Sequence, residues 1–306
     1  MKPHGTRGSA VILAMVLAAL AAVVAVTVLA DQQRWARSVE HRRDQVQAQA
    51  LAMAGVQWAR EILDDAVSHS PSMDHLGEPW AMPLPPIPLE NGEIRGSITD
   101  AQARLNINAL GADGIAADTT TQRIVRLFTA LGGPAPAIDA IADWIDIDDV
   151  PRAAGAEDAY YGAQPSPGLA ANQLITRIGE LADVKGVDSG RLAAVAPFLT
   201  ALPAGTPVNL NTAPPEVLSA ILDGASGESI ATILAQRTQK PFTGIPDFRA
   251  RLPSGTTLRG DDALAVRSDY FYATITARQG GTIATARALL YRSAGAWPEI
   301  VWQVVD

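Results

Sequence analysis

A long apolar stretch lies near the start of the chain. Gly8 is followed by SAVILAMVLAALAAVVAVTVLA over residues 9–30, with no charge and no proline. A helix needs about 20 apolar residues to cross the hydrocarbon core of a bilayer, so this stretch is long enough to span one. A short basic tail with Lys2 and Arg7 precedes it. The role of this stretch governs both the fold and the function expected for the chain.

Three interpretations of the stretch are open. In the first it is a signal peptide cut near Ala30, although the apolar run exceeds the 7–15 residues usual for such a segment. In the second it is a plain transmembrane anchor. In the third it follows a prepilin-type leader of residues 1–8, and the cut between Gly8 and Ser9 leaves the apolar run on the mature protein.

The residues after the stretch favour the third interpretation. Between Ser9 and Ser70 the chain has one glycine and no proline, and apolar residues recur at helical spacing beyond Ala30. We therefore expect one unbroken helix, whereas a signal peptide normally ends at a helix breaker. The charges do not clearly favour an orientation with the N-terminus inside the cell, because more positive charge follows the apolar run than precedes it. The arginines that follow it are Arg34, Arg37, Arg42 and Arg43.

Composition excludes several classes of protein. The 306 residues suffice for two or three domains, and the formal net charge is −8 with scattered basic residues. Nucleic-acid binding requires clustered basic residues, so it is not expected. The chain has no cysteine and only four histidines, which excludes disulfides and zinc-thiolate sites and argues against a histidine metal site. No Walker A, GxSxG or HExxH motif is present.

The remaining chain reads as strands that flank a helical block. Prolines between residues 70 and 90 predict an extended loop that ends the long helix. Strands are expected at 92–100, 104–108, 269–278, 282–292 and 297–305, with a turn at 279–281. Helices are expected at 119–131, 137–145, 175–182, 191–198, 216–222 and 228–237, with Asn211 or Thr212 capping the helix at 216. The predicted fold is α+β, with one long helix packed on a sheet and a helical block inserted between strands.

An acidic loop holds the residues with possible chemistry. Six carboxylates fall within 16 residues, in a stretch interrupted by proline and glycine. They are Asp143, Asp146, Asp148, Asp149, Glu157 and Asp158. Calcium takes six to eight oxygen ligands from such flexible loops, so this composition suits it. The loop is not an EF-hand, because Pro151 occupies the sixth position counted from Asp146, where glycine is required.

Other interpretations of the polar segments remain open. The acidic loop could be a solvated turn whose aspartates cap helix ends. It could also hold a catalytic carboxylate pair, as in a glycosidase, although no histidine or serine clusters with it. The paired helices of residues 209–237 resemble a helix-hairpin-helix DNA-binding unit, but their link at 223–228 has two acids and no basic residue. We expect a packing role for these helices.

Several motifs in a fixed order resemble one known family. They are Gly8–Ser9 with the apolar run, DAQARLNIN at 100–108, DWID at 143–146 with GAED at 155–158, ANQ at 171–173 and VNLNTA at 208–213. Each motif alone is weak, but the ordered set covers nearly the whole chain. It resembles the K-type minor pseudopilins of the type II secretion system (the general secretion pathway protein K family).

The resemblance implies a fold and a role. A prepilin peptidase would cut between Gly8 and Ser9 and methylate the new amine. The protein would be a non-enzymatic, single-pass inner-membrane protein with its bulk in the periplasm, partnered by the I- and J-type minor pseudopilins and the major pseudopilin. The acidic loop would bind Ca²⁺ through Asp146, Asp148, Glu157 and Asp158, with Asp143 and Asp149 as weaker candidates. The alternative is a single-span, membrane-anchored periplasmic calcium-binding protein or hydrolase.

The resemblance also implies a domain organisation and one departure from most pilins. The pilin part would be a long helix on an antiparallel sheet, and the insert would consist of two SAM-like units. The expected segments are a leader at 1–8, an assembly helix at 9–30, the rest of the pilin helix with the first strands at 31–108, helical units at 109–205 and 206–265, and C-terminal strands at 266–306. Most pilins carry glutamate as the fifth mature residue, where this chain has Leu13. A buried carboxylate in lipid is costly unless paired, so a chain without it cannot make the usual pairing with a neighbouring subunit.

Overall fold

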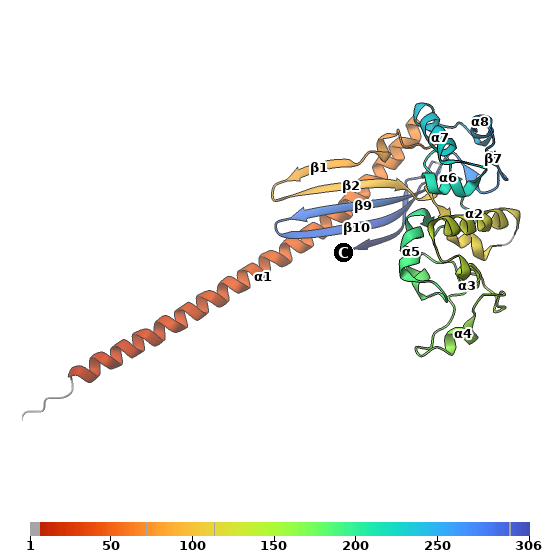
Figure 1. The fold of residues 1–306 in the computed structure, drawn as a ribbon. Helices are drawn as coiled ribbons and strands as arrows, with labels where there is room; N and C mark the ends of the chain where they lie inside the picture. Colours follow the sequence, from red (N-terminus) through yellow and green to blue (C-terminus); the bar gives the residue numbers. More distant parts are fainter. Residues whose placement is uncertain (1–6, 71, 113, 294) are drawn as a thin grey trace, which may run out of the picture.

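The architecture is dominated by one helix. The computed structural model describes residues 7–306 apart from 71, 113 and 294, so most of the predicted leader lies outside the described residues. Helix α1 runs from Arg7 to His69 without interruption, as the glycine and proline pattern predicts. An 18-residue apolar window in it has a mean hydropathy of 3.0, and none of this window is buried. The first half of α1 projects away from the rest of the molecule (Figure 1).

The second half of α1 packs on a five-stranded antiparallel sheet with the strand order β1-β2-β9-β10-β11. The strands are β1 (Leu84–Leu89), β2 (Gly92–Asp100), β9 (Tyr270–Gln279), β10 (Thr282–Tyr291) and β11 (Glu299–Val305). The β9–β10 hairpin turns at Gly280, whose φ of 54° is in the left-handed region that glycine favours. The hairpin tips point toward the projecting end of α1 (Figure 1).

Small side chains let the helix approach the sheet closely. Every third or fourth residue of α1 from Ala48 to Leu63 is buried against the sheet. Alternate residues of β9 and β10 meet them, and many of these are alanines, including Ala273 and Ala286. Gly55 lies where an added Cβ would come 2.5 Å from the side chain of Ile275. The period of 3.6 residues in the helix and of two in the strands therefore produces one continuous core.

The proline-rich segment differs from its prediction as a loop. After a short 3₁₀ turn, η1 (Pro79–Ala81), residues Leu84–Leu89 form the edge strand β1 in spite of Pro85, Pro86 and Pro88. An edge strand needs donors on one side only, so it tolerates residues without an N–H group. The register also shifts between Leu84 and Ile87, which breaks the pairing at the two adjacent prolines.

A helical block lies between β2 and β9 in the sequence and sits at the far end of α1 (Figure 1). Its α-helices are α2 (Ile115–Leu131), α3 (Ile138–Ile145), α4 (Asp158–Gly162), α5 (Ser189–Val195), α6 (Pro215–Ile221), α7 (Gly227–Gln239) and α8 (Ile245–Ala250). Its 3₁₀ helices are η2 (Ala101–Ala103), η3 (Ile107–Gly111), η4 (Ala135–Ala137), η5 (Ile178–Asp183) and η6 (Ala196–Phe198). Two-residue strands pair as β3 (Leu105–Asn106) with β4 (Leu199–Thr200), β5 (Val208–Asn209) with β8 (Leu264–Ala265), and β6 (Leu222–Asp223) with β7 (Thr257–Leu258). A single apolar cluster runs through this block, which we call the head.

Some details of the head differ from the sequence expectations. The segment predicted as a helix at 175–182 contains the 3₁₀ helix η5, and α4 and α8 were not predicted as helices. Neither Asn211 nor Thr212 caps α6, whose N-cap is Pro214. The Asn211 amide donates instead to the carbonyl of Phe242, and the Thr212 hydroxyl donates to Asp100. Asn211 and Thr212, which local spacing predicts as helix caps, thus form hydrogen bonds with residues far away in the sequence.

Candidate metal centre

The acidic loop begins where α3 ends and returns to the head at α4. Asp143 lies in the last turn of α3 and is completely buried. Its carboxylate accepts hydrogen bonds from the backbone N–H groups of Arg152 (3.1 Å) and Ala156 (2.8 Å). The Arg152 guanidinium adds a bond of 2.7 Å to the same carboxylate. Asp143 therefore folds the loop back on α3, a structural role that its place in the acidic run does not reveal.

Gly155 is required where the loop passes Asp143. A Cβ atom at this position would collide with the Asp143 carboxylate. The Lys185 ammonium donates to the Gly155 carbonyl at 2.8 Å and holds the loop from the opposite side. Arg152 also bonds Asp146, so one guanidinium spans two carboxylates. The backbone of the loop is thus fixed mainly by Asp143, Arg152 and Lys185, and of these only Asp143 was a candidate ligand, a weaker one.

Three of the four predicted ligands come together. Carboxylate oxygens of Asp146, Asp148 and Glu157 lie within 4.8 Å of one another, and we call these residues the acidic triad. Asp146 and Glu157 are buried, while Asp148 is exposed. Among the described residues, no hydrogen-bond partner is found for either carboxylate oxygen of Glu157 or for Oδ1 of Asp146.

The electrostatics of the triad favour a bound cation. Burial, together with the charges of Asp143, Asp146, Asp148 and Asp149, raises the pKa of Glu157 to about 7. Burial likewise raises the pKa of Asp146, although the hydrogen bond from Arg152 opposes the shift. A buried carboxylate without a donor is costly. A divalent cation would supply the missing partner for all three orphaned oxygens, and carboxylate oxygens are the ligands that Ca²⁺ takes.

The other acidic residues are used differently. Oδ1 of Asp158 accepts from the backbone N–H of Ala170 at 2.8 Å, and this residue lies outside the triad. Asp149 accepts from the side-chain amide of Asn172 at 3.1 Å. Asn172 has a φ of 45° and its Oδ1 is buried without a partner among the described residues. The strained backbone and orphaned oxygen of Asn172 beside the loop are features that the carboxylate count does not reveal.

A second buried polar group lies where α1, the sheet and the head meet. We call Asp74, Asp100, Ser268 and Arg292 the junction cluster. The Arg292 guanidinium donates to Oδ1 of Asp74 at 2.6 Å and lies over the ring of Phe271. Asp100 accepts from the hydroxyls of Ser268 (2.6 Å) and Thr212. The residues of this cluster are far apart in the sequence, so no spacing pattern predicts it.

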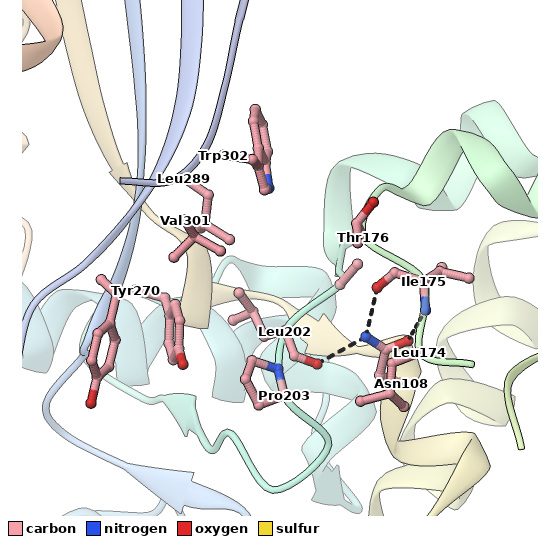
Figure 2. Close-up of a pocket in the computed structure, with 12 residues that line it drawn as sticks. Asn108, Leu174, Ile175, Thr176, Leu202, Pro203, Tyr270, Leu289, Val301 and Trp302 are labelled. Atoms are coloured by element: carbon pink, nitrogen blue, oxygen red, sulfur yellow. Dashed lines mark hydrogen bonds between the residues drawn. The ribbon is translucent and has the colours of Figure 1, made fainter. Parts of the chain in front are cut away.

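A groove of about 290 Å³ separates the sheet from the head (Figure 2). Leu289, Val301 and Trp302 line it from the sheet side, and Leu202 and Ile175 from the head side. The Asn108 amide donates to the carbonyls of Ile175 and Leu202, both at 2.9 Å, and so ties two head segments together. Among the described residues that line the groove, none is Asp, Glu, His, Lys or Arg.

The predicted processing site lies at the other end of the molecule. Gly8 and Ser9 belong to the first turns of α1, and their side-chain surroundings lie outside the described part of the chain. The described residues contain one helix that is long and apolar enough to span a membrane, and that helix is α1.

Comparisons with known proteins agree on one family. Models of the family described as "Type II secretion system (T2SS), protein K" match residues 103–204 and 208–267. The chain is 30% identical to the type II secretion system protein K of Pectobacterium carotovorum subsp. carotovorum, over 94% of this chain and 93% of that protein. It is 31% identical to the Klebsiella pneumoniae protein K over the same shares, and 32% identical to that of Aeromonas hydrophila over 80% of this chain and 81% of that protein.

A solved structure has the same fold. It is a chain in the crystal structure of the GspK-GspI-GspJ complex from the enterotoxigenic Escherichia coli type 2 secretion system. The TM-score is 0.76 at 25% sequence identity, and the match covers 88% of this chain and 98% of that chain. Together with the long helix and the antiparallel sheet, this match confirms the predicted fold class. The chain belongs to the protein K family of the type II secretion system and is a minor pseudopilin.

Proposed function

We propose that this protein forms the tip of a type II secretion pseudopilus, where it starts assembly together with I- and J-type minor pseudopilins. The I and J partners are named in the complex that contains the similar solved chain. On this proposal the protein waits in the inner membrane as a single-pass subunit with its head in the periplasm. It then leaves the bilayer as the filament grows beneath it with the major pseudopilin.

The observation that carries the proposal is the continuity of α1. One helix contains both the exposed apolar window and the buried face that packs on the sheet. Any axial movement of the membrane half is therefore transmitted directly to the head. A signal cut near Ala30 would instead remove the apolar window and divide this continuous helix.

The tip position is supported by the placement of the head. The head sits at the end of α1 remote from the apolar window and extends to one side of the sheet (Figure 1). A second subunit stacked in the same orientation would have to share that space. In addition, Leu13 is apolar at the position where most pilins have glutamate, so this chain cannot offer a carboxylate to a neighbouring amine.

Calcium belongs to the proposal as a structural ligand. The acidic triad would hold it, because its buried oxygens lack donors among the described residues. The ion would neutralise charge and join α3 to the start of α4. An extracytoplasmic site with a Kd of about 10⁻⁴–10⁻³ M would still be filled outside the cell. No catalytic step is proposed, and the alternative of a calcium-dependent hydrolase predicts activity that is lost when the triad is changed.

The processing step gives the sharpest test of the pilin route. We expect the mature protein isolated from membranes to begin at N-methylated Ser9, as measured by intact mass and terminal sequencing. Gly8→Glu should block cleavage, with Gly5→Glu in the leader as the matched control that still permits it. A mature chain that begins at Asp31 would overturn the proposal in favour of a cleaved signal.

Assembly gives the second test. With the full chain solubilised from membranes, we expect the I- and J-type partners from the same cells to co-purify with it. A strain that lacks the protein should fail to export its type II substrates and recover when the chain is supplied. Normal export without the chain, or hydrolytic activity that disappears in Glu157→Gln, would contradict the proposal.

A further inference from the structure

Four arginines lie just beyond the apolar window on the side of the head. Residues 31–43 contain Arg34, Arg37, Arg42 and Arg43 against two carboxylates, Asp31 and Glu40. This is the charge that opposes the positive-inside rule if the head lies in the periplasm. The proposed function does not explain why this positive charge is present.

The geometry of α1 spreads these charges around the helix. At 100° per residue, Arg34, Arg37, Arg42 and Arg43 point in different directions and form a collar. All four side chains are exposed. Arg34 pairs with Asp31 at 2.9 Å, whereas in the described part of the chain Arg37, Arg42 and Arg43 make no ion pair. Arg37, Arg42 and Arg43 therefore remain available to bind a partner outside this protein.

The collar begins at the height of a lipid headgroup layer. Arg34 and Arg37 lie within side-chain reach of that layer, whereas Arg42 and Arg43 lie farther out and act on it through their charge. With a rise of 1.5 Å per residue, Arg34 and Arg37 are about 6 and about 10 Å beyond Ala30, and Arg43 is about 20 Å beyond it. The headgroup layer is about 5–8 Å thick on each side of the hydrocarbon core. Helical side chains also lean toward the N-terminus of their helix, which directs these arginines back toward the bilayer.

An aromatic side chain at the same level adds an independent observation. Trp35 is 70% exposed between Arg34 and Arg37. An indole ring with an apolar body and one N–H donor is typical of membrane interfaces. Packing within the molecule does not explain why Trp35 is exposed. Trp35 lies five residues after Ala30, the last residue of the apolar run.

We propose that this collar, Trp35 with Arg34, Arg37, Arg42 and Arg43, binds anionic lipid headgroups on the outer surface of the inner membrane and sets the height of the head above it. The inference rests on the proposed single-pass anchor. Basic side chains near an anionic surface are attracted to it, and salt screens the attraction. Withdrawal of the helix into a filament would have to break these contacts, so the collar also opposes premature release.

The test uses the absence of cysteine, which permits single spin labels in the full chain. Ser38→Cys reports on the collar and Val16→Cys on the middle of the apolar window. The labelled protein is placed in lipid nanodiscs of phosphatidylcholine with or without phosphatidylglycerol. Collision rates of each label with oxygen and with a water-soluble nickel chelate give its depth.

We expect the label at residue 38 to shift toward the bilayer when phosphatidylglycerol is present and to lose that shift in high salt. The triple variant Arg37→Gln/Arg42→Gln/Arg43→Gln should lose the shift as well. The matched control Arg95→Gln/Arg177→Gln/Arg191→Gln removes three exposed arginines elsewhere and should keep it.

Two negative results are distinguishable. If residue 16 is shielded from the nickel chelate but residue 38 ignores the lipid charge, the collar inference is wrong and the anchor stands. If residue 16 is open to the chelate, the single-pass anchor fails and the collar inference fails with it. A shift that persists in the triple variant would also overturn the inference.

Discussion

The acidic triad and the junction cluster both contain buried carboxylates, but only in the junction cluster do all the oxygens of the buried carboxylates accept hydrogen bonds, although Nε and Nη1 of Arg292 lack partners among the described residues. In the junction cluster, both oxygens of Asp74 and both of Asp100 accept hydrogen bonds. In the acidic triad, three carboxylate oxygens are buried without a donor among the described residues. The difference separates a group whose carboxylates are paired within the chain from a group that we propose is completed by a bound cation.

The two groups also differ in what they connect. The junction cluster joins segments more than 100 residues apart, because Arg292 reaches Asp74 and Ser268 reaches Asp100. The acidic triad connects only α3 with the start of α4, within one loop. Loss of the junction should therefore loosen the attachment of the head to the sheet, whereas loss of the triad should affect the loop. The following predictions test this contrast.

The largest effect is expected at Arg292. Arg292→Met keeps much of the apolar stem but leaves Asp74 buried without its cation. Removing one partner of a buried ion pair typically costs about 3–5 kcal/mol. The free energy of unfolding should fall by that amount in denaturant titrations of the detergent-solubilised chain, followed by far-UV circular dichroism.

The control for that measurement is Arg191→Met on the exposed start of α5. It should change the free energy of unfolding by less than about 0.5 kcal/mol. Equal losses in the two variants would mean that the junction cluster has no special role.

The second effect is a pH dependence that originates at Asp100. Burial raises the pKa of this carboxyl from 3.8 to about 6, although its hydrogen bonds with Ser268, Thr212 and Gln102 oppose the shift. The folded state thus binds this proton more tightly than the unfolded state. The contribution of Asp100 to stability must fall as the pH rises from about 4 to about 6, by up to about 3 kcal/mol.

The comparison variant is Asp100→Asn, which cannot titrate. The difference in unfolding free energy between the native chain and this variant should change across that pH window and be flat above it. A flat difference throughout would show that Asp100 titrates as it does in the unfolded chain.

The third prediction concerns Glu157→Gln. Relative to the native chain, this variant should be less stable in calcium and more stable in chelator. In Glu157→Gln, the amide cannot supply the charge that a calcium ion requires, so stabilisation by calcium should disappear. At a calcium concentration about ten times Kd, this loss is about 1–2 kcal/mol. In chelator the same variant should be more stable than the native chain, because it removes one of the mutually repelling buried carboxylates.

Thermal unfolding of both proteins in each buffer measures this reversal. Glu228→Gln, in the exposed first turn of α7, is the matched control and should behave like the native chain. A variant that is destabilised equally in both buffers would count against a metal role for Glu157.

The smallest effect is expected at Asp158. Asp158→Asn keeps an oxygen that can accept from the Ala170 N–H, so the free energy of unfolding should change by less than about 0.5 kcal/mol. Stabilisation by calcium should persist, because Asp158 lies outside the triad. If calcium no longer stabilised this variant, Asp158 would have to be counted as a ligand.

Local sequence patterns predicted the elements that have a clear hydrophobic period and no helix or strand breaker. The unbroken helix follows from the lack of breakers between Ser9 and Ser70, and β2, β9 and β10 lie within one residue of their expected limits. The strand β1 was missed because proline, which has no N–H group, is excluded from strands only where a backbone donor is needed, and an edge position removes that need. Edge placement is a property of the folded sheet that the segment itself does not encode.

The site was predictable in composition but less so in geometry. Six clustered carboxylates identified the loop, and the structure brings Asp146, Asp148 and Glu157 together. Spacing could not separate these from Asp158, which lies outside the triad and accepts from the Ala170 N–H instead. The junction cluster was not predicted, since its members are adjacent only after the long-range strands have paired.

Calcium titrated into the metal-free full chain in a calorimeter tests the central contrast most directly. We predict saturable heat for the native chain, none for Asp148→Asn/Glu157→Gln, and unchanged binding for Arg292→Met under conditions where it remains folded. An absence of saturable heat in the native chain, or equal binding by the double variant, would contradict the account.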